Sequence, residues 1–408
     1  MTIFTLIICI FLTLGVAHGG PLKFDFGHGQ VAPGFTRIVP ADVFTLEKGY
    51  GFDLGITPES GAAGSCVTGQ GGFFFSVALP EGSYDVKVVL GAANGDSNTT
   101  IKSESRRLMV ESCMTTAGQP LVREFTVNVR QPDIIGGARV AIKEREKGYL
   151  HWDGKLTLEF NGPRPCLASL EISPAVEPVT IYLLGDSTVA DQPFEPWNSW
   201  GQMLPRFFKR GVVVANYAES GESLRSSLAS KRVAKVESLV KAGDYVMIQF
   251  GHNDMKDKSE GALQRYESSL RALVKSIQAR GAVPVLITSM ERKAGITKDT
   301  LEGYPDTVRR VAEDEKTALI DLHSMSRTLY VALGSDLDAA FQDGTHHSNF
   351  GSDQLARCVV RGIRSAGLPI AQMLVADAPA FDPVHPDTPA DFSYAVSPLV
   401  DPKKPDGN

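Results

Sequence analysis

The second half of the chain alternates short apolar runs with segments of helical periodicity. Runs such as "VTIYLLGD", "DYVMIQFG" and "VPVLITSM" are continuous and rich in β-branched residues, as expected for strands buried on both faces. Segments such as "GALQRYESSLRALVKSIQARG" and "TVRRVAEDEKTA" separate these runs and have the periodicity of helices. Strands that alternate with helices predict a doubly wound α/β domain with a parallel sheet, which we place over residues 181–375.

Residues 20–173 have a different pattern. Stretches such as "GFFFSVALPEGSYDVKVVLG" and "REFTVNVRQ" are short, alternating and strand-like, and Gly, Asn, Asp and Pro interrupt them. This pattern predicts an all-β sandwich of the jelly-roll type. The Pro-containing residues 174–180 are the predicted linker. The tail, residues 376–408, is rich in Pro and Asp and is expected either to lie extended on the surface or to be disordered.

The first nineteen residues are typical of a secretory signal peptide. The stretch "MTIFTLIICIFLTLGVAHG" is an apolar run that ends in small residues, and it predicts a secreted or periplasmic protein without a membrane anchor after cleavage. An uncleaved anchor is the alternative, because no Lys or Arg precedes the apolar run. Cleavage would leave four cysteines, which either form disulfides whose pairing the sequence does not rank or remain buried thiols: Cys66, Cys113, Cys166 and Cys358.

Composition restricts the class of partner. Hydrophobic residues make up 43% of the chain and charged residues 22%, as in globular proteins. The formal net charge of -6 argues against a nucleic-acid partner, because phosphate binding requires a positive field. Local charge in a cleft still permits an acidic or neutral small substrate.

Polar residues with catalytic potential follow successive predicted strands. Ligands of doubly wound sheets bind beyond the carboxyl ends of the strands, which is where Ser187, Gly221 and Asn253 occur. A serine at such a turn can act as a nucleophile, and a glycine N–H or an asparagine amide can stabilise an oxyanion. Each residue alone also fits an ordinary turn. The chain lacks the GxSxG motif of ordinary α/β-hydrolases.

A carboxylate and an imidazole follow the last predicted strand. Asp343 and His346 are three residues apart, and a helix cap is expected near Ser348. A carboxylate at this spacing can orient an imidazole that takes a proton from a serine. Helix capping and metal binding are the alternatives, although the further ligands that zinc requires are missing at recognisable spacings. The order of all these residues along the chain favours a serine hydrolase.

The combination resembles a known superfamily. The blocks "LLGDSTVAD", "NYAESGESLRS", "QFGHNDMKD" and "DGTHHSNFG" look like those of the SGNH (GDSL-like) hydrolases, and most like the rhamnogalacturonan acetylesterase branch. The first half, with "FDFGHGQVAPGFTRIVP", resembles the galactose-binding-like β-sandwich that precedes the esterase domain in some members. The resemblance implies a flavodoxin-like α/β domain and an esterase that removes acetyl groups from pectic polysaccharide, with rhamnogalacturonan as the expected substrate.

The resemblance also implies a role for each site residue. Ser187 would be the nucleophile, His346 the general base and Asp343 the carboxylate that orients it; the spacing favours His346 over its neighbour His347. The implied oxyanion hole has three donors: the N–H groups of Ser187 and Gly221 and the side-chain amide of Asn253. The implied acyl-transfer mechanism requires no metal or organic cofactor.

Substrate contacts are less constrained. Arg225 and Lys256 follow the oxyanion blocks and either bind a substrate carboxylate or are solvated; Trp197 and Trp200 either stack on a sugar or pack a helix. Residues 151–153 belong either to a glycan-binding face or to a buried corner. The rival functions are a lipase- or thioesterase-like acyl hydrolase and an inactive carbohydrate-binding protein. The acetylated sugar position and the oligomeric state are not encoded in these patterns.

Overall fold

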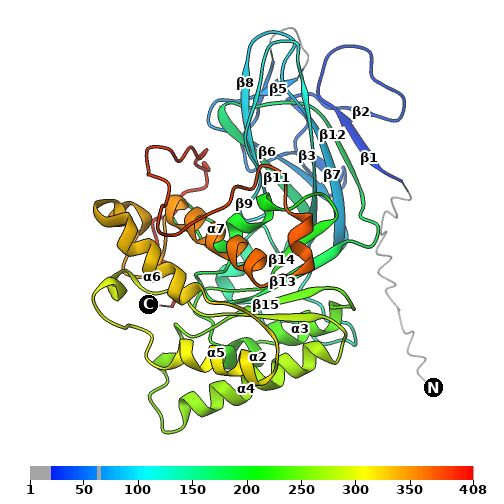
Figure 1. Ribbon diagram of the computed structural model, residues 1–408. Coiled ribbons are helices and arrows are strands. Elements are labelled where there is room, and N and C mark those ends of the chain that lie inside the picture. The colour runs from blue at the N-terminus through cyan, green and yellow to red at the C-terminus, as the bar shows by residue number, and fades with distance from the viewer. Residues whose placement is uncertain (1–19, 62–65, 408) are drawn as a thin grey trace, which may run out of the picture.

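The computed structural model describes residues 20–61 and 66–407, and in it a β-sandwich packs on an α/β domain (Figure 1). The predicted signal peptide, residues 1–19, lies outside the described residues. Within the described ranges, no helix combines the length and apolar character that a membrane span requires.

The β-sandwich consists of two mainly antiparallel sheets that enclose an aromatic core. Phe24, Phe52 and Phe75 are buried there, and the rings of Phe24 and Phe52 each meet the Phe75 ring edge to face. The strands follow the predicted alternation, as in "GSYDVKVVL", in which every second side chain from Tyr84 onward is buried. One sheet has the order β10 (Leu121–Val129), β7 (Gly82–Leu90), β12 (Cys166–Pro174), β1 (Leu22–Asp25) and β2 (Thr36–Arg37), with β4 (Glu59–Ser60) and β5 (Val67–Thr68) at its side. The other has the order β3 (Tyr50–Asp53), β6 (Phe73–Ala78), β11 (Lys155–Arg164), β8 (Ser97–Ser103) and β9 (Arg107–Thr115).

The α/β domain contains a five-stranded parallel sheet, which confirms the predicted doubly wound fold. The strand order is β14 (Val212–Asn216), β13 (Val179–Gly185), β15 (Tyr245–Gln249), β16 (Val283–Ile287) and β17 (Ala318–Ile320). Numbered along the chain this order is 2-1-3-4-5, that of flavodoxin-like folds. Alternate residues of β13 point to opposite faces, so Ile181 and Leu183 belong to one core and Tyr182 and Leu184 to the other.

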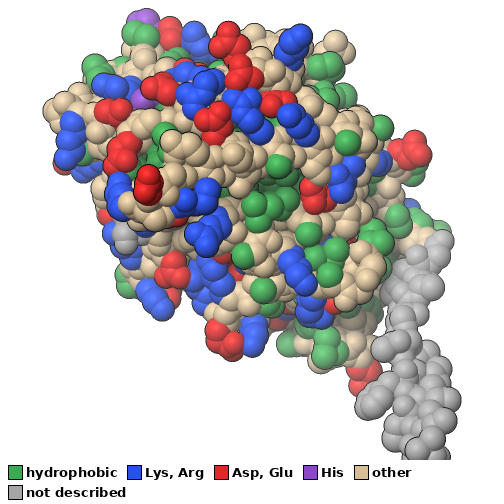
Figure 2. Space-filling model, turned by 90° about the horizontal axis from the view of Figure 1, so that it is seen from below, with side chains coloured by type: hydrophobic (Ala, Val, Ile, Leu, Met, Phe, Trp, Pro, Cys, Tyr) green, Lys and Arg blue, Asp and Glu red, His purple; other side chains and the backbone are tan. Residues whose placement is uncertain are grey.

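Helices cover both faces of this sheet (Figure 1). One core contains α1 (Trp200–Met203), α6 (Leu322–Leu333) and α7 (Asn349–Ser365). The other contains α2 (Leu224–Ala229), α3 (Arg232–Leu239), α4 (Ala262–Gln278) and α5 (Tyr304–Asp314). The surface of the molecule seen from below carries both basic and acidic side chains (Figure 2).

The described residues also contain short 3-10 helices: η2 (Glu144–Gly148), η3 (Leu204–Phe207), η4 (Asp254–Lys256), η5 (Lys293–Ile296), η6 (Gly334–Ala340) and η7 (Pro369–Met373).

The segment "SLASKRVAKVESLVKAG" has continuous helical periodicity, but it contains the end of α2 and, after a break, the whole of α3. The break lies at Lys231, whose φ is +64°. The Ser230 carbonyl accepts a hydrogen bond from the Ala141 N–H at 2.9 Å, and Arg232 forms a buried ion pair with Glu146 at 2.5 Å. Contacts with the β-sandwich therefore override the local helical periodicity.

The turn between β8 and β9 inserts arginines into the α/β domain. Arg106 pairs with Glu195, and Arg107 lies 3.4 Å from the Asp191 carboxylate. The Arg106 guanidinium also donates to the Trp197 carbonyl at 2.9 Å. All these ionic side chains are buried, so the sandwich supports the loop that contains Trp197.

The C-terminal tail is extended but is not a loose surface segment. Phe381 and Ser397 are buried, and the Ser397 hydroxyl donates to Glu159 of the sandwich at 2.8 Å. The Ser397 N–H donates to Glu195 at 3.0 Å. Residues 395–401 thus fill the seam between the two domains. Among the cysteines, Cys66 and Cys166 share a small buried cluster, whereas Cys113 and Cys358 lie in the cores of different domains.

Candidate active site

Ser187 lies two residues beyond the end of β13, at the carboxyl end of the parallel sheet. The strand ends at Gly185, where a Cβ atom would approach the Gln249 carbonyl oxygen to 2.8 Å. Asp186 then accepts hydrogen bonds from the Thr188 N–H at 2.9 Å and hydroxyl at 2.8 Å, which closes an Asx turn. Glycine and this turn place Ser187 beyond the sheet edge.

Ser187, His346 and Asp343 form a continuous hydrogen-bonded chain. The Nε2 atom of His346 lies 2.8 Å from the Ser187 Oγ, and its Nδ1 lies 2.9 Å from the Asp343 Oδ2. Ser187 and His346 are almost fully buried. With a proton on Nδ1, His346 donates to Asp343 and accepts from the Ser187 hydroxyl, which is the arrangement that activates a serine.

Local structure holds Asp343 in its ionised form. Burial alone would raise the pKa of its carboxyl, but hydrogen bonds from the His346 ring and backbone N–H outweigh burial, so the pKa lies well below its ordinary value. The Oδ1 atom accepts from the Thr345 and His346 N–H groups, both at 2.7 Å. The cap predicted near Ser348 is also present, since its side chain accepts from the Gly351 N–H at the start of α7.

His347 has a different environment from His346. Its Nε2 lies 2.8 Å from the Tyr330 hydroxyl, and its ring packs against Phe341 with centroids 4.3 Å apart. Burial lowers the pKa of His347 to about 3. His347 is therefore a neutral residue of the core, and the structure brings only His346 of the pair to Ser187.

Gly221 and Asn253 come together next to the end of the tail. A methyl group on Gly407 would lie 3.1 Å from both the Gly221 nitrogen and the Asn253 Oδ1. Gly221 has a φ of +79°, which favours glycine. The Asn253 Nδ2 donates to the Glu222 carbonyl at 3.0 Å, and this bond uses one of its two N–H groups.

A second layer of polar contacts, which the sequence analysis missed, fixes the loops. His252 connects the Asp186 carboxylate, at 3.2 Å, to the Met290 carbonyl, at 2.9 Å. The Gln192 side chain donates to the Ser187 carbonyl at 2.6 Å and to the Ser220 hydroxyl at 3.3 Å. His252 lies inside the quoted "QFGHNDMKD" block, but nothing in the sequence links it to Asp186.

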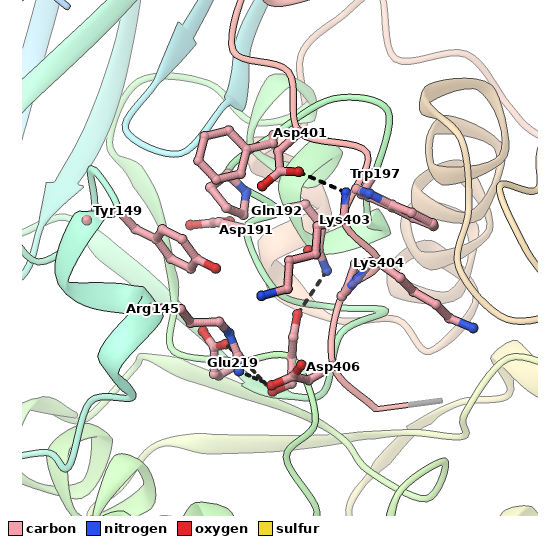
Figure 3. A pocket seen from close by; sticks show the side chains of 15 residues that line it. Arg145, Tyr149, Asp191, Gln192, Trp197, Glu219, Asp401, Lys403, Lys404 and Asp406 are labelled. Carbon is pink, nitrogen blue, oxygen red and sulfur yellow. Dashed lines mark hydrogen bonds and ion pairs between the residues drawn. The ribbon is translucent and has the colours of Figure 1, made fainter.

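A cavity of about 280 Å³ is lined by residues of three origins (Figure 3), and one of them, Gln192, donates the hydrogen bond to the Ser187 carbonyl. The loop after β13 contributes Trp197, whose ring meets the His346 ring edge to face with centroids 5.7 Å apart. The β-sandwich contributes Arg145 and Tyr149, and the tail contributes Lys404 and Asp406. The sandwich and the tail therefore complete a cavity that belongs to the α/β domain.

The other predicted substrate residues have diverse positions. Trp200 is buried in the core and donates to Gln249 at 2.9 Å, so it packs a helix. The Lys256 ammonium donates to the Asn253 Oδ1 at 2.9 Å.

Arg225 is 83% exposed and lines a separate groove of about 930 Å³, which Asn253 also lines. His151 and Trp152 are buried, which excludes them from an exposed glycan-binding face and leaves the buried corner.

Two groups of side chains among the described residues have spacings suited to a metal ion. They are Glu146, His151 and Glu219, and Glu291, Asp299 and His323. In the first group both carboxylates already pair with arginines, Glu146 with Arg232 and Glu219 with Arg145. Neither group includes a residue of the Ser187 chain, so we assign no role in the site to a cation.

Comparison with known proteins identifies the family. Residues 183–354 match the GDSL-like Lipase/Acylhydrolase family, and residues 22–131 match the galactose-binding-like domain of beta-agarase/YXIM esterase-like proteins. Rhamnogalacturonan acetylesterase RhgT from Bacillus subtilis is 33% identical over 221 residues, which are 49% of this chain and 95% of RhgT. The chain belongs to the GDSL-like lipase/acylhydrolase family. It is therefore a carboxylic ester hydrolase of the SGNH type with an N-terminal galactose-binding-like domain, as the resemblance implied.

Both domains have counterparts together in one relative. The uncharacterized esterase YxiM from B. subtilis is 28% identical over 378 residues, which are 85% of this chain and 91% of YxiM. The X-ray structure of the YxiM protein is 26% identical in sequence and covers 86% of this chain and 99% of its own, with a TM-score of 0.47.

Proposed function

We propose that this member of the GDSL-like family is an exported serine esterase that removes acetyl groups from pectic polysaccharide, and specifically from rhamnogalacturonan. The observation that carries the proposal is the hydrogen-bonded chain from Asp343 through His346 to Ser187. This chain supplies a nucleophile, a base and an orienting carboxylate, which together suffice for ester hydrolysis.

The proposed reaction begins with acyl transfer to the enzyme. His346 Nε2 takes the Ser187 proton as the serine oxygen attacks the ester carbonyl, and Asp343 stabilises the resulting imidazolium. The N–H groups of Ser187 and Gly221 and the Asn253 amide stabilise the oxyanion. The carbon–oxygen bond to the sugar then breaks, and the sugar oxygen leaves with the proton from His346.

Hydrolysis of the acetyl-enzyme restores the site. His346 takes a proton from a water molecule, whose oxygen attacks the acetyl carbonyl. The bond to Ser187 breaks, acetate leaves, and the serine oxygen regains its proton from His346. Neither the acylation step nor the hydrolysis step requires an oxidant, a reductant or a metal.

Two observations support a carbohydrate acetyl ester as the substrate. RhgT, which matches over nearly its whole length, is named as a rhamnogalacturonan acetylesterase. Trp197 packs at the edge of the His346 ring and lines the cavity, so the space beside the base is bounded by an aromatic wall. A small acyl group with a sugar on its alcohol side suits a cavity with this polar and aromatic lining.

Acetate release tests the proposal. Purified enzyme should release acetate faster from acetylated rhamnogalacturonan than from acetylated homogalacturonan or xylan, and Ser187→Ala should abolish release. Ser238→Ala is a matched control, because among the described residues the Ser238 hydroxyl forms one hydrogen bond, to the Lys235 carbonyl within α3. A preference for longer p-nitrophenyl acyl esters over the acetate would instead identify an acyl hydrolase of the lipase or thioesterase kind.

Export is part of the proposal and rests on the sequence of residues 1–19. Expression in a secreting host should yield mature protein outside the cytoplasm with an N-terminus near Gly20. Mass spectrometry of the recovered protein would contradict export if it found an intact Met1.

A further inference from the structure

Arg145 brings a positive charge from the β-sandwich into the cavity that Trp197 and Gln192 also line. It lies in η2 and donates to the Glu219 carboxylate at 2.5 Å and to the Ser220 carbonyl at 2.8 Å. Its side chain is 26% exposed and lines the cavity (Figure 3), so a ligand there can reach the guanidinium. Arg145 therefore joins the sandwich to the loop that holds Gly221.

The C-terminal tail already offers Arg145 a carboxylate. Asp406 forms an ion pair with the Arg145 guanidinium, and the next residue, Gly407, lies against Gly221 and Asn253. The Gly407 carbonyl also accepts a hydrogen bond from Lys256. The tail thus places a carboxylate on Arg145 and the Gly407 peptide group against Gly221 and Asn253, two of the three proposed oxyanion donors.

The end of the tail is held by contacts that a ligand can displace. Asp401 is tied to Glu195 by a backbone hydrogen bond of 3.0 Å, next to the buried Ser397. Beyond that point the contacts include the Lys256 hydrogen bond to Gly407 and two ion pairs, each with one well-exposed member: Lys404, 48% exposed, lies 3.2 Å from Asp343, and Asp406, 56% exposed, pairs with Arg145. Exposed ion pairs contribute little because water and salt screen them. Residues 402–407 are therefore a removable occupant of the cavity.

Charge around Arg145 favours an external carboxylate. Lys143, on the same turn of the sandwich, points its ammonium at Glu222 at 2.9 Å. Burial, together with the neighbouring Glu146 charge, raises the pKa of Glu219 to about 7, so near neutral pH this partner balances only part of the Arg145 charge. A guanidinium can bind a carboxylate through two parallel hydrogen bonds, which gives geometric selectivity.

We propose that Arg145 is the specificity-determining subsite for a carboxylate of the sugar chain, that of a uronic acid, and that Asp406 occupies this subsite in the free enzyme. The inference rests on the proposed function for the kind of chain that enters the cavity. A uronate carboxylate can replace Asp406 on Arg145. Displacement of Asp406 would also move the neighbouring Gly407 away from Gly221 and Asn253, so that these oxyanion donors become accessible to the ester. A neutral chain has no group to make this exchange.

Calorimetric titration of the intact protein with trigalacturonate tests the proposal without a catalytic assay. The wild-type protein should bind trigalacturonate at least ten-fold more tightly than its methyl ester. Arg145→Gln should weaken binding of the acid at least ten-fold, and Arg145→Lys should restore part of the loss. Asp406→Asn should strengthen binding of the acid three-fold or more. Lys147→Gln, a matched control on the same turn with 58% exposure, should leave the Kd unchanged.

Equal binding of the acid and its methyl ester by the wild-type protein, or an unchanged Kd in Arg145→Gln, would overturn the subsite. An unchanged Kd in Asp406→Asn would overturn its occupation by the tail. If Arg145→Gln does not fold, two comparisons still test the proposal: the affinity of the wild-type protein for the acid against that for the methyl ester, and the affinity of Asp406→Asn for the acid against that of the wild type. Acetate release from rhamnogalacturonan tests the proposed function separately, so Arg145-dependent binding without acetate release would refute that function and leave the subsite in place.

Discussion

The Arg106 guanidinium of the β-sandwich lies 2.6 Å from the Glu195 carboxylate of the α/β domain, and both side chains are buried. The same guanidinium donates hydrogen bonds to the carbonyl groups of Gln192 and Trp197. One side chain therefore supports the loop whose residues line the cavity. The sandwich is therefore a structural part of the esterase site, whether or not it also binds glycan.

Arg106→Met should destabilise the protein strongly. The substitution leaves the Glu195 charge buried without its partner, a change that typically costs about 3–5 kcal/mol. Urea unfolding would measure the loss. The double variant Arg106→Met with Glu195→Gln should recover part of it, and Arg139→Met, at a pair that is mostly exposed, should have little effect. A double variant no more stable than the single one would contradict this explanation.

Asp343→Asn should lower kcat for p-nitrophenyl acetate about 10²–10⁴-fold with little change in KM. An asparagine amide can present an N–H to His346 Nδ1, which stabilises the wrong tautomer and removes the acceptor for the Ser187 proton. Asp338→Asn is the control, because Asp338 is 87% exposed and pairs only with Lys293 among the described ion pairs. Initial rates at saturating substrate would measure kcat for both variants. A kcat of Asp343→Asn within two-fold of the wild type would exclude the role given to Asp343.

Asn253→Ala should lower kcat about 10²–10³-fold, the usual effect of removing one oxyanion donor. The same substitution removes the bond to the Glu222 carbonyl, so the circular dichroism spectrum and melting temperature should be compared as a check of the loop. Asn253→Asp, of similar size but without the amide donor, should lose as much activity as the alanine variant. Full activity in the aspartate variant would show that the amide does not serve the oxyanion.

The fold of the α/β domain and the Ser187 chain follow from local signals. Continuous apolar runs identify the strands, and in a parallel sheet the residues after the strands meet at one edge, so strand order alone predicts that Ser187, Gly221 and Asn253 lie at the same edge. The spacing of Asp343 and His346 is likewise local, because both belong to one turn.

Contacts between distant segments could not be predicted in this way. Arg145 and Asp406 are 261 positions apart, and neither stands in a motif. The roles of Trp197 and Trp200 differ although only two residues lie between them, because Trp200 is the first residue of α1 and packs in the core, whereas Trp197 lies in the loop before it. The tail has the composition of a disordered segment, yet Ser397 is buried by polar partners from both domains, which composition does not encode.

The Asp254 carboxyl has an environment that favours its protonated form. It accepts one hydrogen bond, from the Leu224 N–H at 2.9 Å, and its other oxygen is buried without a hydrogen-bond partner among the described residues. The pKa of Asp254 rises to about 7 from an ordinary value of 3.8, mainly because the carboxyl is buried and also because the negative charge of Asp186 lies nearby.

Asp254→Asn should therefore change how stability depends on pH. A carboxyl whose pKa is raised by folding stabilises the protein fully below its unfolded pKa, and this contribution is lost as pH rises through about 7. The wild-type free energy of unfolding should fall, relative to that of the variant, by roughly 2–4 kcal/mol between pH 4 and pH 8. Asparagine has the shape of the protonated acid but does not ionise. Urea unfolding at several pH values measures both curves, and parallel curves would show that Asp254 does not titrate in this range.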